Sequence, residues 1–311
     1  QSELLRTLCA IGRAALPDLR EFTGASLQSV RALRDAGLIS LEDVPVYRRP
    51  EAPEGERQPL PKLNSEQTKA FKGILKLAGG KKASGALLFG VTGSGKTTIY
   101  IRLIAEMRRR GKTAILLVPE IALTPQMLRT FSSHFGDDIA VLHSSLSAGE
   151  RLDEWRRIKN GEAGVVIGTR SAIFAPAEDL GIIIIDEEQE DSYKSENAPR
   201  YHARDVAKFR CAQDNALLLL GSATPDVESR WRAEQGSYAY FTLSRRFNEQ
   251  SMPSVEIVDM KRELRRGNGS SISERLRSEI SENLERGEQS ILFLNRRGAN
   301  KLITCVDCGF T

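Results

Sequence analysis

The stretch Ala86-Leu-Leu-Phe-Gly-Val-Thr-Gly-Ser-Gly-Lys-Thr97 joins an apolar run to a loop with three glycines. The loop, Gly90 to Thr97, matches the P-loop pattern G-x-x-x-x-G-K-S/T. Ile101, Ile104 and Met107 follow it at helical spacing. The glycines let main-chain N–H groups turn towards a phosphate, and the start of a helix adds partial positive charge. The stretch therefore predicts a nucleotide-binding strand, loop and helix.

The polar residues of this loop have distinct expected roles. The ammonium group of Lys96 is expected to reach the β- and γ-phosphates, and the hydroxyl of Thr97 is expected to coordinate Mg²⁺. The residues expected to hold the nucleotide are Gly90, Val91, Thr92, Gly93, Ser94, Gly95, Lys96, Thr97 and Thr98.

Short, dense apolar runs recur before and after the P-loop helix. These runs are 86–89, 114–118, 139–142, 165–167, 182–185 and 217–220. They are apolar on both faces and are separated by helical segments, as in parallel strands covered by helices. The sequence therefore predicts an α/β domain with a RecA-like parallel sheet of the P-loop class.

The run Ile182-Ile-Ile-Ile-Asp186-Glu187-Glu188-Gln189 ends in acids. Parallel α/β sheets bind ligands at the carboxyl ends of their strands, so this end is expected beside the P-loop. Asp186 is expected to hold Mg²⁺, mostly through water, and Glu187 to orient and polarise the attacking water. Lys96, Asp186 and Glu187 are thus the predicted catalytic residues, with Gln189 added below.

Composition places few limits on function. Lys and Arg outnumber Asp and Glu by 45 to 41, a net charge of +4 that permits a polyanionic partner without demanding one. No apolar run approaches the roughly 20 residues that span a bilayer, and no signal peptide is visible. We therefore expect a cytoplasmic protein. The first residue is Gln1 rather than Met, which suggests that the chain begins within a longer protein.

Pattern changes divide the chain into four parts. Residues 1–48 show three amphipathic stretches and a short apolar segment, 38–41, expected as a strand; this is the outline of a winged helix, or equally of a plain helical appendage. A proline-rich linker, 49–62, precedes the α/β domain at 63–241. The last part, 242–311, is expected to contain a helix over 272–284 and a strand over 290–294.

The ordered motifs of the chain resemble those of superfamily-two helicases and, within them, the bacterial replication-restart helicases. The stretches that carry the resemblance are GVTGSGKT (90–97), VPEIALTPQ (118–126), VIGTRSAIFAP (166–176), IIDEEQEDSYK (184–194), PRYHARDVA (199–207), GSATP (221–225), ILFLNRRG (291–298) and CVDCG (305–309). The resemblance implies that 63–241 is the first helicase lobe and that 242–311 begins a second, truncated lobe and a zinc-binding region.

The resemblance also implies roles for single residues. Gln67 matches a glutamine that recognises adenine, although an ordinary surface glutamine is the alternative. Ser222 and Thr224 match a motif that couples hydrolysis to movement, and Thr169 and Arg170 match one that contacts DNA phosphates. Gln189 stands where the family commonly has histidine; it can still exchange hydrogen bonds with that coupling motif, but it cannot become charged near neutral pH.

Residues 193–209 resemble an aromatic-rich loop of this family. Tyr193, Tyr201 and His202 are the predicted DNA contacts there, because aromatic faces stack on unpaired bases while neighbouring basic groups, including Arg204, hold the backbone. The alternative is that some of these aromatics are core residues of the next helix, and Phe209 is the first candidate.

Cys305 and Cys308 match the first pair of the family's zinc ligands. A structural zinc site needs four ligands and this segment supplies two, so the site would be incomplete here. A redox pair is the alternative, but no thioredoxin-like pattern surrounds it.

The motifs predict a site for ATP and Mg²⁺, and the resemblance implies an ATP-dependent DNA helicase of bacterial replication restart that also uses Zn²⁺. The expected partners are single-stranded and forked DNA and, by resemblance, primosome proteins and single-strand-binding protein, with the chain as a cytoplasmic monomer. Two alternatives remain: a motor that moves along duplex DNA without unwinding it, and a nucleotide-binding scaffold that recruits partners. A single lobe is also expected to turn over ATP poorly.

Overall fold

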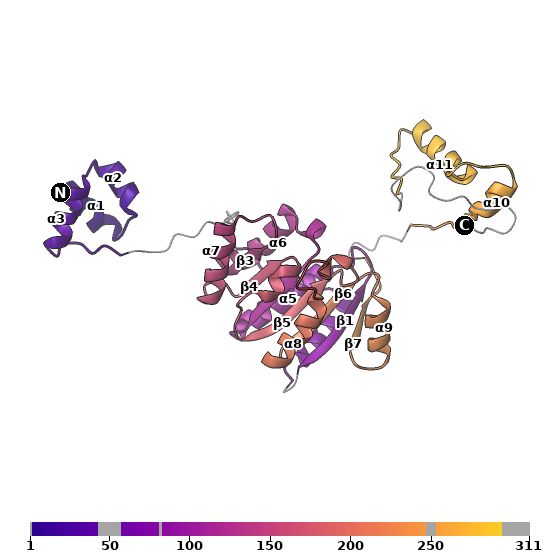
Figure 1. Cartoon of the computed structure of the whole chain (residues 1–311), viewed down its shortest axis with the longest axis horizontal. Coiled ribbons are helices and arrows are strands. Elements are labelled where there is room, and N and C mark those ends of the chain that lie inside the picture. The colour runs from indigo at the N-terminus through magenta and orange to yellow at the C-terminus, as the bar shows by residue number, and fades with distance from the viewer. Residues whose placement is uncertain (1, 43–56, 81–82, 247–252, 294–311) are drawn as a thin grey trace. The chain divides into compact units, whose positions relative to one another are not determined.

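A computed structural model describes residues 2–42, 57–80, 83–246 and 253–293 (Figure 1). The chain forms two compact units, residues 1–249 and 250–311. The first contains a small helical bundle and the α/β domain that holds the P-loop.

The α/β domain is built on a seven-stranded sheet in the order β3-β4-β2-β5-β6-β1-β7, and all of its pairings are parallel. The strands are β1 Ser84–Gly90, β2 Thr113–Leu117, β3 Ile139–Leu142, β4 Val165–Gly168, β5 Leu180–Asp186, β6 Leu217–Ser222 and β7 Ala239–Leu243. Six of them coincide with the six apolar runs, which confirms the predicted RecA-like sheet; β7 was not predicted.

Helices cover both faces of this sheet, as a parallel sheet requires. They are α4 Ser65–Leu77, α5 Lys96–Arg109, α6 Pro125–Phe135, α7 Ala148–Lys159, α8 Ala203–Asp214 and α9 Val227–Glu234. The short 3₁₀ turns are η1 Glu120–Ala122, η2 Gly136–Asp138, η3 Arg170–Phe174 and η4 Asp191–Tyr193. One core joins the sheet to α4, α5 and α6, and the other joins it to α7, α8 and η3.

Alternation along β5 explains why its isoleucines are all buried. Ile182 and Ile184 pack into the first core, whereas Ile183 and Ile185 pack into the second. The strand order places β6 between β1 and β5, with Asp186 paired to Gly221 in the ladder. The P-loop, the acids and the GSATP segment therefore leave the sheet side by side.

The amino-terminal bundle consists of α1 Ser2–Ile11, α2 Leu16–Thr23 and α3 Leu27–Asp35. Its core is Leu4, Leu19, Val30 and Leu33. Ser26 caps α3, because its Oγ accepts a hydrogen bond from the Ser29 N–H at 3.2 Å.

The strand predicted over 38–41 is wrong, because this segment is irregular. Ile39 packs against the helices while Leu38 and Leu41 are exposed, and no strand in the described ranges pairs with it. The winged-helix outline thus lacks its β element here.

The second unit contains α10 Met260–Arg265 and α11 Glu274–Glu285, so the helix predicted over 272–284 is confirmed. Ser273 caps α11 by accepting a hydrogen bond from the Leu276 N–H. The strand predicted over 290–294 is wrong for residues 290–293, which are irregular; residue 294 lies outside the described ranges. A strand needs a partner, and no strand in the described part of this unit supplies one.

Gly168 has no room for a side chain. A Cβ there would lie 2.1 Å from the Leu142 carbonyl oxygen of the neighbouring strand, which is backbone and cannot rotate away. We expect Gly168→Ala to lower the free energy of unfolding by about 1 to 3 kcal/mol through overpacking. Urea denaturation followed by tryptophan fluorescence measures this, since both tryptophans, Trp155 and Trp231, belong to the α/β domain.

Gly79→Ala is the matched control. Its added Cβ would meet nothing closer than 3.7 Å, so the unfolding midpoint should barely move. Equal effects at the two positions would contradict the steric argument.

Candidate functional site

The P-loop forms a compact cradle between β1 and α5. Gly95 has φ +83°, a left-handed conformation that glycine adopts without strain, and α5 begins at the next residue. Lys96 Nζ donates to the Gly90 carbonyl oxygen at 3.0 Å and lies 3.6 Å from Glu187 Oε1. Ser94 Oγ is buried and has no hydrogen-bond partner within the described residues. An unpartnered hydroxyl, an ammonium group and a helix N-terminus fit a phosphate chain.

Gln67 lies beneath this loop rather than on the surface, because its side chain is fully buried. Its Oε1 accepts from the Asn64 N–H in a capping box at the start of α4, and its Nε2 donates to the Ser94 carbonyl oxygen at 2.9 Å. A Cβ at Gly95 would lie 2.3 Å from that Nε2. The ordinary surface glutamine is therefore excluded, while adenine recognition by Gln67 stays a prediction.

Asp186 is held by two tyrosines. Tyr100 Oη donates to Asp186 Oδ1 at 2.8 Å, and Tyr193 Oη donates to the Asp186 main-chain oxygen at 2.6 Å. Burial raises the pKa of Asp186 above its ordinary value, and the Tyr100 hydrogen bond and the Lys96 charge act in the opposite direction. Asp186 and the hydroxyl of Thr97 are oxygen donors of the kind that Mg²⁺ prefers.

Glu187 adopts an unusual backbone conformation, with φ +45°. This left-handed region is strained for a residue with a side chain, and such strain is concentrated at functional sites. The turn directs Glu187 towards Lys96, while the next N–H, that of Glu188, donates to the Gly221 carbonyl oxygen. Consecutive acids therefore point to different neighbours.

Gln189 links the acids to the GSATP segment. Its Nε2 donates to Glu187 Oε2 at 3.2 Å, and its Oε1 accepts from Ser222 Oγ at 2.6 Å. Ser222 Oγ in turn accepts from the Thr224 N–H at 2.8 Å. The predicted contact between Gln189 and this segment is thus present, although its coupling role stays a prediction.

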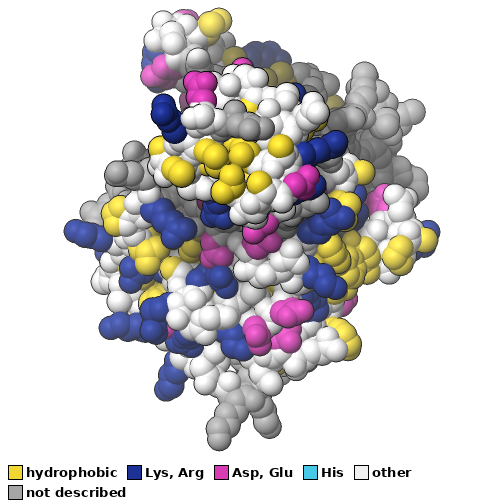
Figure 2. All heavy atoms as spheres, turned by 90° about the vertical axis from the view of Figure 1, so that its left-hand side faces the viewer, with side chains coloured by type: hydrophobic (Ala, Val, Ile, Leu, Met, Phe, Trp, Pro, Cys, Tyr) yellow, Lys and Arg dark blue, Asp and Glu magenta, His cyan; other side chains and the backbone are white. Residues whose placement is uncertain are grey.

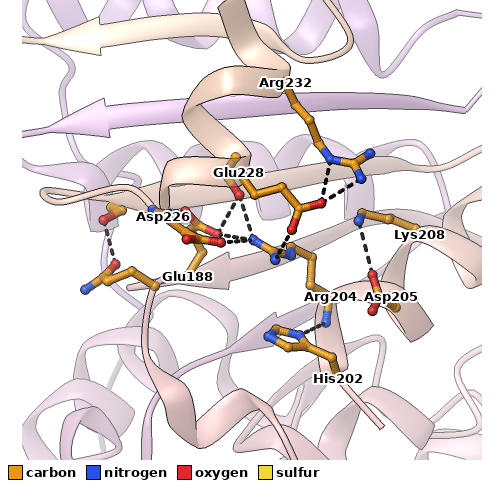
Figure 3. A network of polar contacts seen from close by, with 11 residues as sticks. Glu188, His202, Arg204, Asp205, Lys208, Asp226, Glu228 and Arg232 are labelled. Atoms are coloured by element: carbon orange, nitrogen blue, oxygen red, sulfur yellow. Dashed lines mark hydrogen bonds and ion pairs between the residues drawn. The ribbon is translucent and has the colours of Figure 1, made fainter.

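A buried ionic network behind the acids was missed by the sequence reasoning. Arg204, from α8, reaches the Oε2 of Glu188 at 3.0 Å and Oδ2 of Asp226 at 3.0 Å (Figure 3). Its second Nη donates to Glu228 Oε2 at 3.3 Å, and Glu188 also accepts from Ser229 Oγ. Figure 3 shows the carboxylates of Glu188, Asp226 and Glu228 converging on one guanidinium.

This network corrects the expectation that Arg204 helps to hold a DNA backbone. The side chain is buried and its Nη atoms are used by acids of the protein itself. The sequence signal for this network was Glu188, the third acid of D-E-E-Q, because a carboxylate that follows a buried strand so closely is expected to need a cationic partner. In the structure Glu188 is only 2% exposed, and Arg204 is that partner.

Two aromatic assignments in 193–209 are also corrected. Tyr193 is 1% exposed and packs in the second core, so its ring offers no face to a base. Phe209 is 65% exposed, so it is not the expected core residue of the helix. Tyr193 lies in the one-turn η4, which is too short for helical periodicity to show which side is buried.

Arg170 and Tyr201 do lie together, at the carboxyl edge of the sheet. The Arg170 guanidinium carbon is 5.8 Å from the centre of the Tyr201 ring, and its Nη1 donates to the main-chain oxygens of Ser192 and Lys194. Phe174, which the sequence reasoning missed, meets the Tyr201 ring edge-on at 4.9 Å and is 46% exposed. The sequence signal that could have found Phe174 was its position one turn after Arg170, the arginine of the G-T-R motif.

The other two predicted DNA residues are less open. Thr169 is buried, and its N–H donates to the Leu142 carbonyl oxygen. His202 is half-buried and caps α8, with Nδ1 accepting from the Arg204 N–H. Burial, followed by the Arg204 charge, lowers the pKa of His202 below its ordinary value. DNA contact by Thr169, Arg170, Tyr201 and His202 stays a prediction.

Charge alone does not outline a nucleic-acid surface. On the face shown in Figure 2, Lys and Arg side chains are widely spread among acidic and hydrophobic ones. In the part of the chain that the structure describes, no three His, Cys, Asp or Glu side chains are placed to hold a metal ion. The predicted zinc ligands Cys305 and Cys308 lie outside that part. Within the same ranges, no helix combines the length and apolar character that crossing a membrane requires.

Fold and site together define a class of protein. A parallel sheet with a P-loop after β1 and Asp186 and Glu187 after β5, joined through Lys96, is the RecA-like domain of a P-loop protein. The family model described as DEAD/DEAH box helicase matches residues 64–230, and the chain belongs to this family. Membership implies the use of ATP and Mg²⁺.

Curated relatives carry a more specific name. The replication restart protein PriA of Bacillus subtilis is 46% identical over 295 residues, which are 94% of this chain and 36% of that protein. The PriA of Treponema pallidum is 47% identical over 249 residues, 80% of this chain and 37% of that protein. The chain therefore spans about a third of the length of these relatives.

Solved structures show more distant likenesses. RecG bound to a three-way DNA junction is 23% identical, with a TM-score of 0.46, over 72% of this chain and 31% of that chain. The Hef helicase domain of Pyrococcus furiosus is 19% identical, with a TM-score of 0.44, over 71% and 53%.

Arg204→Met should destabilise the α/β domain strongly. The change leaves the Glu188 carboxylate buried without its cation, and breaking a buried ion pair from one side costs about 3 to 5 kcal/mol. The free energy of unfolding, measured by urea denaturation with tryptophan fluorescence, should fall by that amount.

Arg232→Met is the control, because it removes another arginine that pairs with Glu228, at an exposed site. An exposed pair contributes about 0 to 1 kcal/mol, so this variant should unfold near the wild-type midpoint. Similar losses in the two variants would show that burial of the pair is not what matters.

Proposed function

We propose that this chain is the first motor lobe, together with flanking segments, of an ATP-dependent DNA helicase that acts in replication restart. The observation that carries the proposal is the contact of Lys96 with Glu187 beside the Gln189–Ser222 hydrogen bond. These contacts connect Lys96, Glu187 and Gln189, which in this proposal hold ATP, activate water and respond to hydrolysis. The curated relatives named replication restart protein PriA support the biological setting.

In this proposal the P-loop holds the phosphates, with Lys96 Nζ leaving the Gly90 carbonyl oxygen for the β- and γ-phosphates. Thr97 and Asp186 would hold Mg²⁺, which would supply positive charge to neutralise the phosphate oxygens. Glu187 accepts a hydrogen bond from the attacking water and orients it. Gln67 contacts the adenine after its present hydrogen bond to the P-loop is exchanged.

Strand movement would follow from the coupling residues. A shift of Glu187 on hydrolysis moves Gln189 and, through its hydrogen bond, Ser222 and Thr224. Thr169, Arg170, Tyr201 and His202 would contact the tracking strand, and Phe174 and Tyr201 supply the aromatic faces. Single-stranded and forked DNA, primosome proteins and single-strand-binding protein are the proposed partners of a monomer in the bacterial cytoplasm, with zinc held by a site that includes Cys305 and Cys308.

Lys96→Ala in the full-length protein should lower DNA-stimulated ATP hydrolysis by on the order of a hundredfold or more, because it removes the cation that faces the phosphates. Binding of forked DNA, measured by fluorescence anisotropy, should stay near the wild-type value. Lys72→Ala, an exposed lysine of α4, is the control and should change neither quantity.

An equal loss of fork binding in Lys96→Ala would mean that the DNA site is misplaced. Wild-type protein that hydrolyses no ATP with single-stranded DNA present would remove both motor functions and leave the scaffold. Hydrolysis and movement on duplex DNA without fork unwinding would select the duplex translocase.

Phe174→Ala should weaken binding of single-stranded DNA by about 1 to 3 kcal/mol, the contribution of one aromatic that stacks on a base. Phe209→Ala is the matched control: Phe209 is also an exposed phenylalanine, but it lies in α8 and is not one of the groups that meet the Tyr201 ring. Anisotropy titration of a labelled oligonucleotide measures both. Equal affinities in the two variants would remove Phe174 from the DNA site.

A further inference from the structure

The hydroxyl of Tyr100 makes a contact that the P-loop motif does not require. Tyr100 lies one turn into α5, three residues after Thr97, and its side chain is 1% exposed. Its Oη donates to Asp186 Oδ1 at 2.8 Å, across the space between the P-loop helix and the end of β5. The partner is a side chain of the site rather than a main-chain group.

The intervening strand leaves room for this hydroxyl. β6 lies between β1 and β5, and a Cβ at Gly221 would lie 1.8 Å from Tyr100 Oη and 3.3 Å from Asp186 Oδ1. Gly221 does not have a positive φ, so its lack of a side chain is needed for space and not for backbone conformation. Tyr100 and Gly221 are therefore complementary in shape at the carboxylate of Asp186.

Asp186 is thereby held at its carboxylate and at its main-chain oxygen by tyrosines of different elements. Tyr193 holds its main-chain oxygen, and Tyr100 holds its carboxylate. A carboxylate fixed at Oδ1 cannot rotate freely, so the lone pairs that Tyr100 does not use keep one direction. Fixed ligand orientation is what hydrogen bonds behind metal ligands provide in other metal sites.

We propose that Tyr100 is a positioning residue for Mg²⁺, which acts by fixing the Asp186 carboxylate and for which Gly221 provides the space. The inference rests on the proposed function in one respect, namely that Asp186 holds Mg²⁺ with bound ATP. Tyr100 itself touches neither the cation nor the nucleotide.

Tyr100→Phe in the 311-residue chain tests the inference. The readout is binding of a fluorescent ATP analogue, titrated with Mg²⁺ and repeated in EDTA. The Mg²⁺ concentration for half-maximal enhancement of binding should rise about three- to tenfold, the range expected for the loss of one ordinary hydrogen bond. The affinity in EDTA should not change, because the ring and the P-loop are kept.

Tyr238→Phe is the matched control. Tyr238 is also a buried tyrosine, but it packs against Gly85 at the amino end of β1, away from the P-loop at the other end of that strand. Its hydroxyl has no partner among the described residues. The control should reproduce the wild-type Mg²⁺ dependence. An unchanged Mg²⁺ dependence in Tyr100→Phe, or a loss of affinity that is as large in EDTA, would overturn the positioning role.

Wild-type protein whose binding of the analogue does not respond to Mg²⁺ gives a different result. It would remove the assumed role of Asp186, and with it the proposed function of the site, before Tyr100 is considered. The two failures are therefore distinguishable in a single data set.

Gly221→Ala tests the complementary half of the inference. Its methyl group would displace the Tyr100 hydroxyl and should raise the Mg²⁺ requirement as Tyr100→Phe does. Once that hydroxyl is absent the methyl group has less to displace, so adding Gly221→Ala to Tyr100→Phe should produce little further change. Independent, multiplying effects of the two substitutions would contradict the shared mechanism.

Discussion

Asp186, Glu187 and Glu188 place three carboxyl groups in succession at the end of a buried strand. Burying an ionised carboxylate without a partner costs several kcal/mol of folding free energy, because the charge loses its hydration. The acids are met from helices on both sides of the sheet: Asp186 by Tyr100 and Glu187 by Lys96, both of α5, and Glu188 by Arg204 of α8. The need to satisfy these acids therefore ties both helical layers to the sheet, and the site is also a structural junction.

The left-handed turn at Glu187 makes this division possible. Without it, alternation along an extended strand would send Asp186 and Glu188 to the same face. Glu188 instead enters the ionic network while Asp186 faces the P-loop helix. The contacts of the three acids with Lys96, Arg204 and Tyr100 offset the local backbone strain. Strain persists at functional sites when the surrounding structure compensates for it in this way.

The sheet and the P-loop could be predicted because their signals are local: continuous apolar runs and a fixed motif. β7, with the sequence AYFTL, was missed because only the last of its five residues is fully buried, so it shows no such run. The segments 38–41 and 290–293 have the apolar character of strands but no partner in the described residues, and pairing cannot be read from propensity. The role of Glu188 was missed, and Arg204 and Tyr193 were misassigned, because their surroundings are set by residues distant in the chain.

The ionic network around Arg204 also limits which substitutions related sequences can accept at its positions. One guanidinium serves three acids, from the end of β5, from the segment after β6 and from α9, and a lysine has no planar fork with which to replace it. A neutral change at Glu188 removes the most buried of the three carboxylates, whereas a neutral change at Arg204 leaves all three without their shared cation. Related sequences should therefore keep these residues together or replace them together, so that substitutions at these positions should be correlated.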